Sequence, residues 1–164
     1  MPSGKSLNDC LMMVLLALVD LFMVTLGMRQ HQYALTKDLS KFYQRVDADE
    51  LTQHVKRVMW RGGDQMRKLD LYVITTVNFG DLPAGCITIA ALRETAARYG
   101  TSMEEAAWFL MNRTYLDDMT ARADRISKDL EDIAANGGFT FKETLMSGDA
   151  EEEAENPKKV LGLI

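Results

Sequence analysis

The sequence has few cysteines and no surplus of basic residues, and both shortages exclude classes of protein. Only Cys10 and Cys86 are cysteines among 164 residues, which is too few for a disulfide framework and indicates a reducing compartment. The 19 Lys and Arg against 24 Asp and Glu give a formal net charge of −5, so bulk charge offers no argument for nucleic-acid binding. Apolar residues at 47% and charged residues at 26% exclude a disordered or collagen-like chain. We expect one globular domain with a real core.

The sequence does contain a long apolar run near its N-terminus. Residues 11–28 read LMMVLLALVDLFMVTLGM. A membrane span needs roughly 20 such residues, and Asp20 in the middle of the run would be costly in lipid. Lys5 precedes the run, as in a signal peptide, but no small-residue cleavage site follows it. We expect a buried core helix that Ser6 caps, with a membrane span and a signal peptide as alternatives, and therefore favour an intracellular, cytoplasmic protein without a membrane anchor.

Strand-like and helix-like segments alternate after residue 30, which predicts an α+β fold. β-branched and aromatic residues favour strands at residues 33–38, 69–77 and 139–141. Capping-box patterns, Asp47 with Glu50 and Ser102 with Glu105, predict helices at 47–60 and 102–111. Further helices are expected at 87–99 and 123–135, turns at 61–64 and 136–138, and a solvated acidic loop at 149–155.

Residues 95–110 are compatible with two interpretations. Gly100 could be the turn of a helix-turn-helix motif, or the two helices could simply pack in the core. Glu104 and Glu105 would repel DNA phosphates from the second helix, and this favours two packed core helices.

The second candidate site is the run Tyr115-Leu116-Asp117-Asp118. Adjacent carboxylates usually belong to a solvated turn. Here they lie between the apolar residues 108–111 and the helix expected from 123, so a tight turn would place both carboxylates at a strand tip. Such a pair repels itself unless a cation is bound, which makes it a candidate divalent-metal site.

These four residues resemble the Y-x-D-D box of reverse transcriptases, and other segments resemble the family's remaining motifs in the same order. Residues 34–44 (ALTKDLSKFYQ) resemble the first catalytic motif, in which an Asp at a strand end is followed five residues later by an aromatic residue. Residues 58–61 (VMWR) and 72–84 resemble the FLWR and V-x-F-G segments of the Bel/Pao retrotransposon branch. Residues 6–9 with Arg29 match the lead-in, residues 137–142 the fourth motif, and residues 160–163 (VLGL) the fifth. The resemblance covers nearly the whole chain.

The resemblance implies a polymerase palm-type sheet with packed helices, partial fingers and no thumb. Residues 1–30 would be an apolar helix and lead-in, residues 31–148 the palm and fingers core, and residues 149–164 an acidic loop and the start of the primer grip. In such a fold the strand carrying Asp38 and the hairpin carrying Asp117 and Asp118 lie side by side.

The implied activity is that of an RNA-directed DNA polymerase from a Bel/Pao-like retroelement, which joins nucleotides by two-metal-ion transfer. Asp38 and Asp117 would be the principal ligands of Mg²⁺ or Mn²⁺, and Asp118 a supporting one. The backbone carbonyl of Leu39 could complete the ligand set, because Mg²⁺ prefers oxygen ligands.

Four further residues receive roles from the resemblance. Tyr43 would lie under the sugar of the incoming nucleotide and exclude a 2′-hydroxyl; a core aromatic is the alternative. Phe79 and Gly80 would approach the nucleotide and template. Lys142 would protonate the pyrophosphate leaving group as a general acid; a solvated lysine is the alternative.

The implied partners are an RNA or DNA template-primer, deoxynucleoside triphosphates and the rest of a retroelement polyprotein. Leu161 and Gly162 would belong to the primer grip. We expect the chain to be a fragment that does not extend a primer by itself, because the thumb and most of the fingers are missing. The alternatives are a non-catalytic remnant or interaction module that keeps the palm fold, and a membrane-anchored helical protein.

Overall fold

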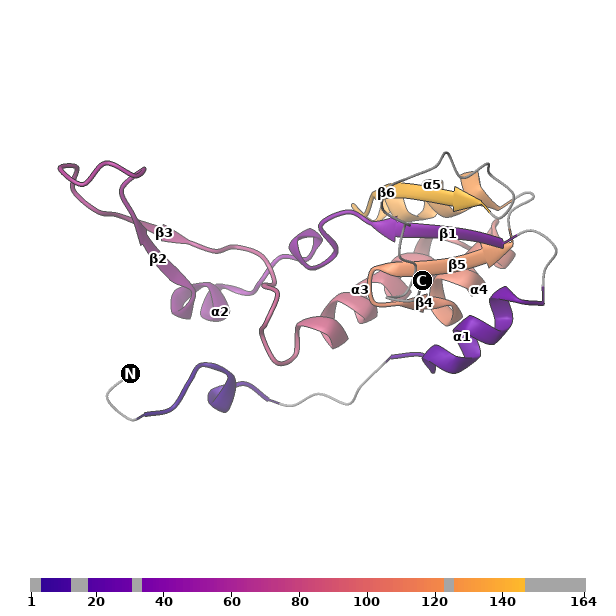
Figure 1. Ribbon diagram of the computed structural model, residues 1–164, viewed down its shortest axis with the longest axis horizontal. Coiled ribbons are helices and arrows are strands. Elements are labelled where there is room, and N and C mark those ends of the chain that lie inside the picture. The colour runs from indigo at the N-terminus through magenta and orange to yellow at the C-terminus, as the bar shows by residue number, and fades with distance from the viewer. Residues whose placement is uncertain (1–3, 13–17, 31–33, 123–125, 147–164) are drawn as a thin grey trace, which may run out of the picture.

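The structure, a computed structural model, describes residues 4–12, 18–30, 34–122 and 126–146. The predicted acidic loop and the predicted primer-grip residues Leu161 and Gly162 lie outside these ranges. The fold is α+β, as predicted: helices pack on an antiparallel sheet, and a hairpin projects from that body (Figure 1). In chain order the elements are α1 (Leu21–Met28), β1 (Ala34–Leu39), α2 (Glu50–Val55), β2 (Arg57–Trp60), β3 (Asp70–Val73), α3 (Ala84–Tyr99), α4 (Glu104–Asn112), β4 (Thr114–Tyr115), β5 (Asp118–Arg122), α5 (Ser127–Asn136) and β6 (Phe141–Met146). Two short 3₁₀ turns, η1 (Asn8–Cys10) and η2 (Phe42–Arg45), complete the described part.

The main sheet has the strand order β4-β5-β1-β6, and all its neighbours are antiparallel. Successive side chains of β1 alternate between buried and half-buried. This alternation is that of a strand with one face on a core and the other open. Asp38, near the end of β1, lies on the more open face.

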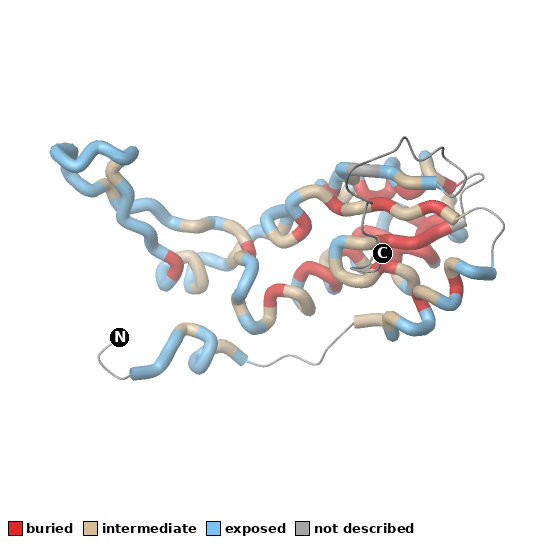
Figure 2. The backbone as a smooth tube through the Cα atoms, viewed as in Figure 1, coloured by how far each residue is buried: buried red, intermediate tan, exposed pale blue. Residues whose placement is uncertain are grey.

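The core lies between this sheet and a layer formed by α3, α4 and α5 (Figure 2). The packing of α3 against α4 confirms the expectation of two core helices at residues 95–110. Each fully buried Leu or Ile side chain stabilises the fold by about 1.5–3 kcal/mol. These side chains are Leu35, Leu39, Leu92, Leu110, Leu130 and Ile133.

One lysine is buried within this apolar layer. The Lys37 ammonium donates to Glu131 Oε1 at 2.5 Å and to Thr144 Oγ1 at 2.8 Å, and it lies 5.1 Å from the centroid of the Phe141 ring. A buried ammonium is tolerated only when it is paired in this way. The Lys37–Glu131 pair thereby ties α5 to the central strand.

The projecting hairpin corrects one prediction. The helix predicted for residues 47–60 ends at Val55, and residues 57–60 form strand β2, which pairs with β3. The cap is Asp49 rather than Asp47: its carboxylate accepts from the Thr52 backbone N–H at 3.0 Å. The local helix pattern does not hold residues 57–60 in a helix, because these residues pair with the β-branched and aromatic residues of β3.

The apolar run at residues 11–28 also differs from expectation. Its described helix, α1, is short, and Asp20 is its N-cap, accepting from the Phe22 N–H at 2.8 Å. Asp20 therefore has a polar role at a helix start and is not buried in mid-helix. Ser6 does not cap this helix; its N–H and hydroxyl donate to the Asp9 carboxylate at 2.7 and 2.9 Å. Among the described residues, no helix has both the length and the apolar character needed to cross a membrane.

Candidate active site

The predicted strand tip is a tight hairpin. Strands β4 and β5 are joined by Leu116 and Asp117, with Tyr115 paired to Asp118. Leu116 has φ +56°, in the left-handed region that bulky residues rarely adopt. Its side chain packs against the core, which holds the turn in this conformation.

The hairpin lies beside the end of β1, as the motif pattern predicts. Asp38 is the direct antiparallel partner of Asp118, so both residues lie on the same face of the sheet. The Leu39 N–H donates to the Asp117 carbonyl at 2.8 Å, which fixes the hairpin tip against the strand end. Two segments that are distant in sequence are thus joined by backbone hydrogen bonds.

The chain turns sharply after β1 and places an aromatic cluster beside the strand end. Lys41 has φ +54°, and the 3₁₀ turn η2 follows it. The Phe42 ring is buried and packs edge-on to Tyr43, with ring centroids 5.3 Å apart. Tyr43 in turn contacts the Phe79 ring at 5.7 Å. The edge-to-face contacts orient both rings.

A cavity of about 400 Å³ opens where these three segments meet. Its size is that of a small-molecule site. Leu116 and Lys41, the two non-glycine residues with positive φ in the described ranges, both line it, and backbone strain of this kind gathers at functional sites. The lining residues are Asp38, Leu39, Ser40, Lys41, Phe42, Tyr43, Gln44, Phe79, Leu116, Asp117 and Lys142.

The cavity combines two carboxylates with two ammonium groups. Lys142 Nζ lies 3.5 Å from Asp38 Oδ2, and both side chains keep contact with solvent. Burial raises the pKa of Tyr43, and the nearby Asp117 carboxylate raises it further because it opposes a second negative charge. The phenol is therefore neutral at physiological pH and acts as a hydrogen-bonding, apolar wall.

The carboxylates of the cavity are suited to a divalent cation only together with further oxygen ligands. No group of three or more His, Cys, Asp or Glu side chains that could hold a metal ion occurs in the described part of the chain. The cavity offers the oxygens of Asp38 and Asp117, and Mg²⁺ is commonly bound by one or two carboxylates with substrate phosphates supplying further oxygens. The donor set therefore fits a Mg²⁺ ion that arrives with a phosphorylated ligand.

Most of the sequence-predicted site residues gather at this cavity. Six of them line it: Asp38, Leu39, Tyr43, Phe79, Asp117 and Lys142. The Leu39 side chain is buried in the core, so only its backbone is available to a ligand. Asp118 and Gly80 adjoin lining residues but do not line the cavity themselves, and Leu161 and Gly162 lie outside the described residues.

Sequence reasoning missed four polar or aromatic lining residues, Ser40, Lys41, Phe42 and Gln44. Their proximity in sequence to Asp38 and Tyr43 was the available signal. Ser40 directly follows β1, and the turn at Lys41 redirects the chain so that Phe42 and Gln44 also line the cavity.

Neither a protein-family model nor a curated protein matches the chain.

Proposed function

We propose that the cavity binds a deoxynucleoside triphosphate with Mg²⁺, and that the chain is the palm region of an RNA-directed DNA polymerase from a Bel/Pao-like retroelement. One observation carries the proposal: Asp38 at the end of β1 pairs in register with the Y-x-D-D hairpin, and Asp38 and Asp117 line one cavity. The antiparallel sheet with its helical layer supports the palm assignment.

The residue chemistry suits nucleotidyl transfer. The primer 3′-hydroxyl gives up its proton to water as its oxygen forms a bond to the α-phosphorus. The bond to the pyrophosphate oxygen breaks, and negative charge develops on the attacking and leaving oxygens. A bound Mg²⁺ would supply electrostatic stabilisation of those oxygens. Asp38 and Asp117 would hold the cation, and Lys41 and Lys142 would face the phosphates from the same cavity.

Lys142 is suited to a second task. Its ammonium is within ion-pair distance of Asp38, on the open face of the sheet, and it retains contact with solvent. A proton donated from Lys142 Nζ to the departing pyrophosphate would neutralise the charge that forms there. In the free protein, the Asp38 carboxylate lies 3.5 Å from this ammonium and helps to hold it near the cavity.

Tyr43 and Phe79 form an aromatic wall of the same cavity. A bulky ring under the sugar would clash with a 2′-hydroxyl and so favour deoxynucleotides over ribonucleotides. The edge-to-face contact between Tyr43 and Phe79 supports this role because it holds the Tyr43 ring in one orientation.

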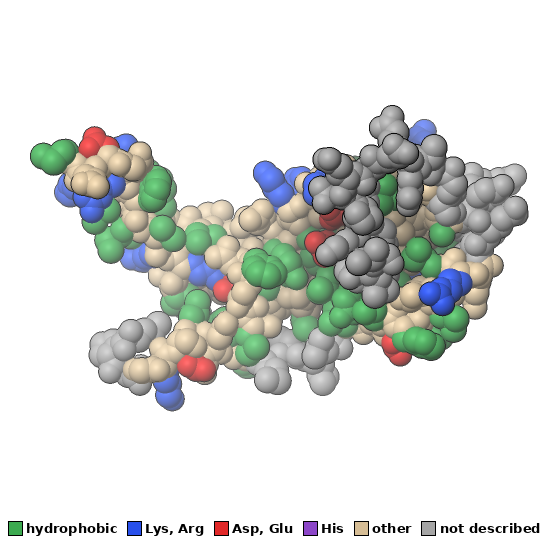
Figure 3. All heavy atoms as spheres, viewed as in Figure 1, with side chains coloured by type: hydrophobic (Ala, Val, Ile, Leu, Met, Phe, Trp, Pro, Cys, Tyr) green, Lys and Arg blue, Asp and Glu red, His purple; other side chains and the backbone are tan. Residues whose placement is uncertain are grey.

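The projecting hairpin supports a nucleic-acid partner. This arm, residues 57–73, contains four Lys and Arg against two Asp, whereas the whole chain is acidic. The aromatic side chains of Trp60 and Tyr72 are about half exposed on it. Figure 3 shows basic and apolar side chains gathered together on the arm. Aromatic faces interleaved with basic groups are typical of surfaces that bind single-stranded nucleic acid.

A non-catalytic interaction module with the same fold is the second candidate. Its support is the apolar surface of α1, where Phe22 and Met23 are exposed, together with the half-exposed Trp108 on α4. Large exposed apolar side chains of this kind are typical of protein-binding surfaces.

Nucleotide binding separates the two candidates. Calorimetry should detect Mg²⁺-dependent binding of dTTP to the wild-type chain, and Asp38→Asn and Asp117→Asn should each weaken it at least tenfold. Asp132→Asn, a charge-matched change on α5 outside the cavity, should leave the affinity unchanged. Equal affinity in wild type and both cavity variants, or no binding by wild type, would reject the polymerase assignment and favour the interaction module.

A further inference from the structure

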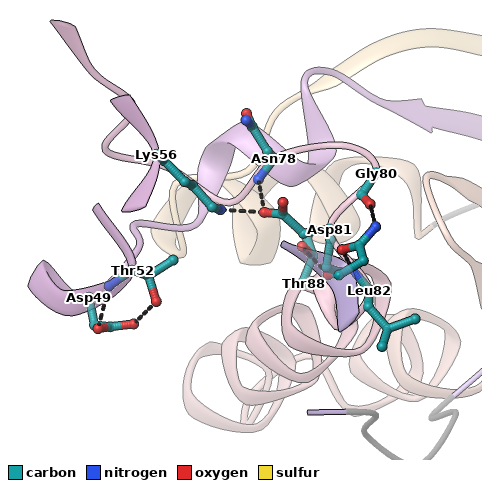
Figure 4. Close-up of polar contacts among 10 residues, drawn as sticks. Asp49, Thr52, Lys56, Asn78, Gly80, Asp81, Leu82 and Thr88 are labelled. Carbon is teal, nitrogen blue, oxygen red and sulfur yellow. Dashed lines mark hydrogen bonds and ion pairs between the residues drawn. The ribbon is translucent and has the colours of Figure 1, made fainter. Parts of the chain in front are cut away.

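We infer that Lys56 and Asp81 form a positioning pair that holds Phe79 at the wall of the nucleotide cavity, and that this pair governs affinity for the base of the nucleotide. The inference rests on the proposed function for its ligand. Figure 4 shows the pair, with the Lys56 side chain reaching from the base of the arm to the loop before α3.

Lys56 is a lysine that the fold has largely removed from water. It lies between α2 and β2, its side chain is 5% exposed, and its Nζ is paired with Asp81 Oδ2, whose side chain is 14% exposed. The Ile74 N–H donates to the Lys56 carbonyl at 2.9 Å, so both chains of the arm leave the body at this residue. Burying an ammonium is costly unless a carboxylate pairs with it, and Asp81 is the partner that Lys56 has.

The partner, Asp81, organises the loop of residues 78–82. Its carboxylate accepts from the Asn78 N–H at 3.3 Å, and its carbonyl accepts from the Ala84 N–H at 3.0 Å (Figure 4). Between these contacts Gly80 adopts φ +94°, which a side chain would disfavour. The loop therefore closes around the Asp81 carboxylate, and Lys56 fixes that carboxylate to the arm.

Asn8 anchors the same loop from the N-terminal segment. Its Nδ2 donates to the Gly80 carbonyl at 2.9 Å, and the Leu82 N–H donates to its Oδ1 at 2.9 Å. The side-chain amide thus uses both its donor and its acceptor on the loop backbone. Asp81 and Asn8 hold the loop on both sides of Phe79 along the chain.

The anchored loop carries Phe79 at the wall of the cavity. Its side chain is 84% exposed, it lines the cavity, and its contact with Tyr43 has an interplanar angle of 68°. An exposed aromatic face in a cavity that also holds Asp38, Asp117, Lys41 and Lys142 is suited to stacking with a base. Because Asp81 and Lys56 contact the loop and not the charged groups, they should affect binding of the base and spare binding of the phosphates.

The test compares wild type with the single variant Asp81→Asn and a double variant. It measures the contact between the Phe79 and Tyr43 rings without ligand, the affinity for dTTP and the melting temperature. Wild type should show a nuclear Overhauser effect between the Phe79 and Tyr43 rings. The variant Phe79→Leu, which lacks the Phe79 ring, identifies the signals of that ring. Asp81→Asn, which leaves the buried ammonium without its carboxylate, should lower the melting temperature and lose this effect. Lys56→Met/Asp81→Asn removes both charges; it should recover the melting temperature but not the ring contact, and should bind dTTP about tenfold more weakly than wild type.

Inorganic tripolyphosphate is the probe for the phosphate half, and its Mg²⁺-dependent affinity should be the same in the double variant and wild type. Glu131→Gln is the matched control, because it also leaves a buried lysine, Lys37, without its carboxylate; it should lower stability but preserve the ring contact. Asn8→Ala, at an exposed site, should weaken the ring contact without unfolding the chain.

A double variant that recovers the melting temperature, the ring contact and dTTP affinity together would overturn the inference, because the pair would then be purely structural. If the double variant does not fold, Asp81→Glu decides instead, because it keeps the charge pair but displaces the loop from Lys56: an unchanged ring contact in Asp81→Glu overturns the inference. Absence of dTTP binding by wild type would reject the proposed function, whereas the ring contact, which needs no ligand, would still decide whether the pair positions Phe79.

Discussion

Asp38 and Asp118 face each other in register across β1 and β5. Like charges on directly opposed positions of an antiparallel pair destabilise a sheet. The next residue of the hairpin, Asp117, adds a further carboxylate at the cavity that Asp38 lines. Lys142 offsets part of this repulsion from a distance of 3.5 Å to Asp38. This end of the sheet therefore carries negative charge that a bound cation would relieve.

Mg²⁺ should consequently stabilise the folded chain. At a free Mg²⁺ concentration ten times its Kd, mass action adds about 1.4 kcal/mol to the free energy of unfolding. For a chain of this length the melting temperature should rise by roughly 3–6 °C. Asp117→Asn should remove most of this rise and should itself melt higher than wild type without metal, because one repelling charge is gone.

Differential scanning fluorimetry in MgCl₂, against NaCl of equal ionic strength, provides the measurement. Asp132→Asn on α5 is the control and should respond to Mg²⁺ as wild type does. The same rise in wild type and Asp117→Asn would place the Mg²⁺ effect elsewhere on the protein.

The pKa of Tyr43 should depend on the charge of Asp117. Burial and the Asp117 carboxylate raise the Tyr43 pKa above its usual value of 10.0, so the folded state retains a proton that the unfolded state releases. The resulting stabilisation is complete below the unfolded pKa and is lost as the pH rises through the folded pKa. Asp117→Asn should lower the Tyr43 pKa but not abolish the shift, since burial is the larger cause.

Ultraviolet titration of tyrosinate absorbance, with Tyr43→Phe subtracted to isolate this residue, gives the pKa. Saturating Mg²⁺ should lower it in wild type and leave it unchanged in Asp117→Asn. A Tyr43 pKa that is identical in wild type and Asp117→Asn would show that the two side chains are not coupled.

Tyr43 should also decide which sugar the cavity accepts. Removing the ring with Tyr43→Ala should reduce the preference for dTTP over the corresponding ribonucleotide at least tenfold, because the clash with the 2′-hydroxyl disappears. Tyr43→Phe keeps the ring and should keep the preference. Competition binding with both nucleotides measures it; retention of the preference in Tyr43→Ala would assign sugar selection to another group.

Local patterns in the sequence predicted much of the fold. The strand at residues 33–38 and the helices at 87–99, 102–111 and 123–135 correspond to β1, α3, α4 and α5 within a few residues. The Tyr115–Asp118 run predicted a hairpin, and the structure has one. These elements were predictable because their periodicity or turn chemistry is contained in neighbouring residues.

Features that depend on distant contacts were not predictable in this way. Residues 57–60 continue a helix-like pattern locally and become a strand through pairing with β3. The ion pairs of Lys37 with Glu131 and of Lys56 with Asp81 join segments that are distant in sequence. Lysine is mostly a surface residue, so the sequence alone does not predict that these two are buried. The cavity residues Lys41 and Gln44 depend on a positive-φ turn that Lys41 gives no local reason to expect.

The arm should bind single-stranded nucleic acid, and its aromatic and basic side chains should contribute in separable ways. Trp60→Ala should weaken binding by about 1–3 kcal/mol, since a base that stacks on the indole loses its platform. The triple variant Arg57→Gln/Arg61→Gln/Lys68→Gln should lower the slope of log affinity against log salt by about 2, because each phosphate that is no longer neutralised reduces the slope by about 0.7. Arg67 is left intact because it is paired with Asp70.

Fluorescence anisotropy with labelled oligo-dT and a matched RNA, over a series of salt concentrations, measures both effects. Arg98→Gln removes a single basic residue, paired with Glu94 on α3 and away from the arm; as the control it should leave the salt slope unchanged. The stacking loss in Trp60→Ala should persist at high salt, because stacking releases no counterions, whereas the effect of the triple variant should shrink as salt screens the phosphates. A triple variant with the wild-type slope would exclude the arm as the electrostatic contact, and would leave its exposed apolar side chains as a surface for a protein partner.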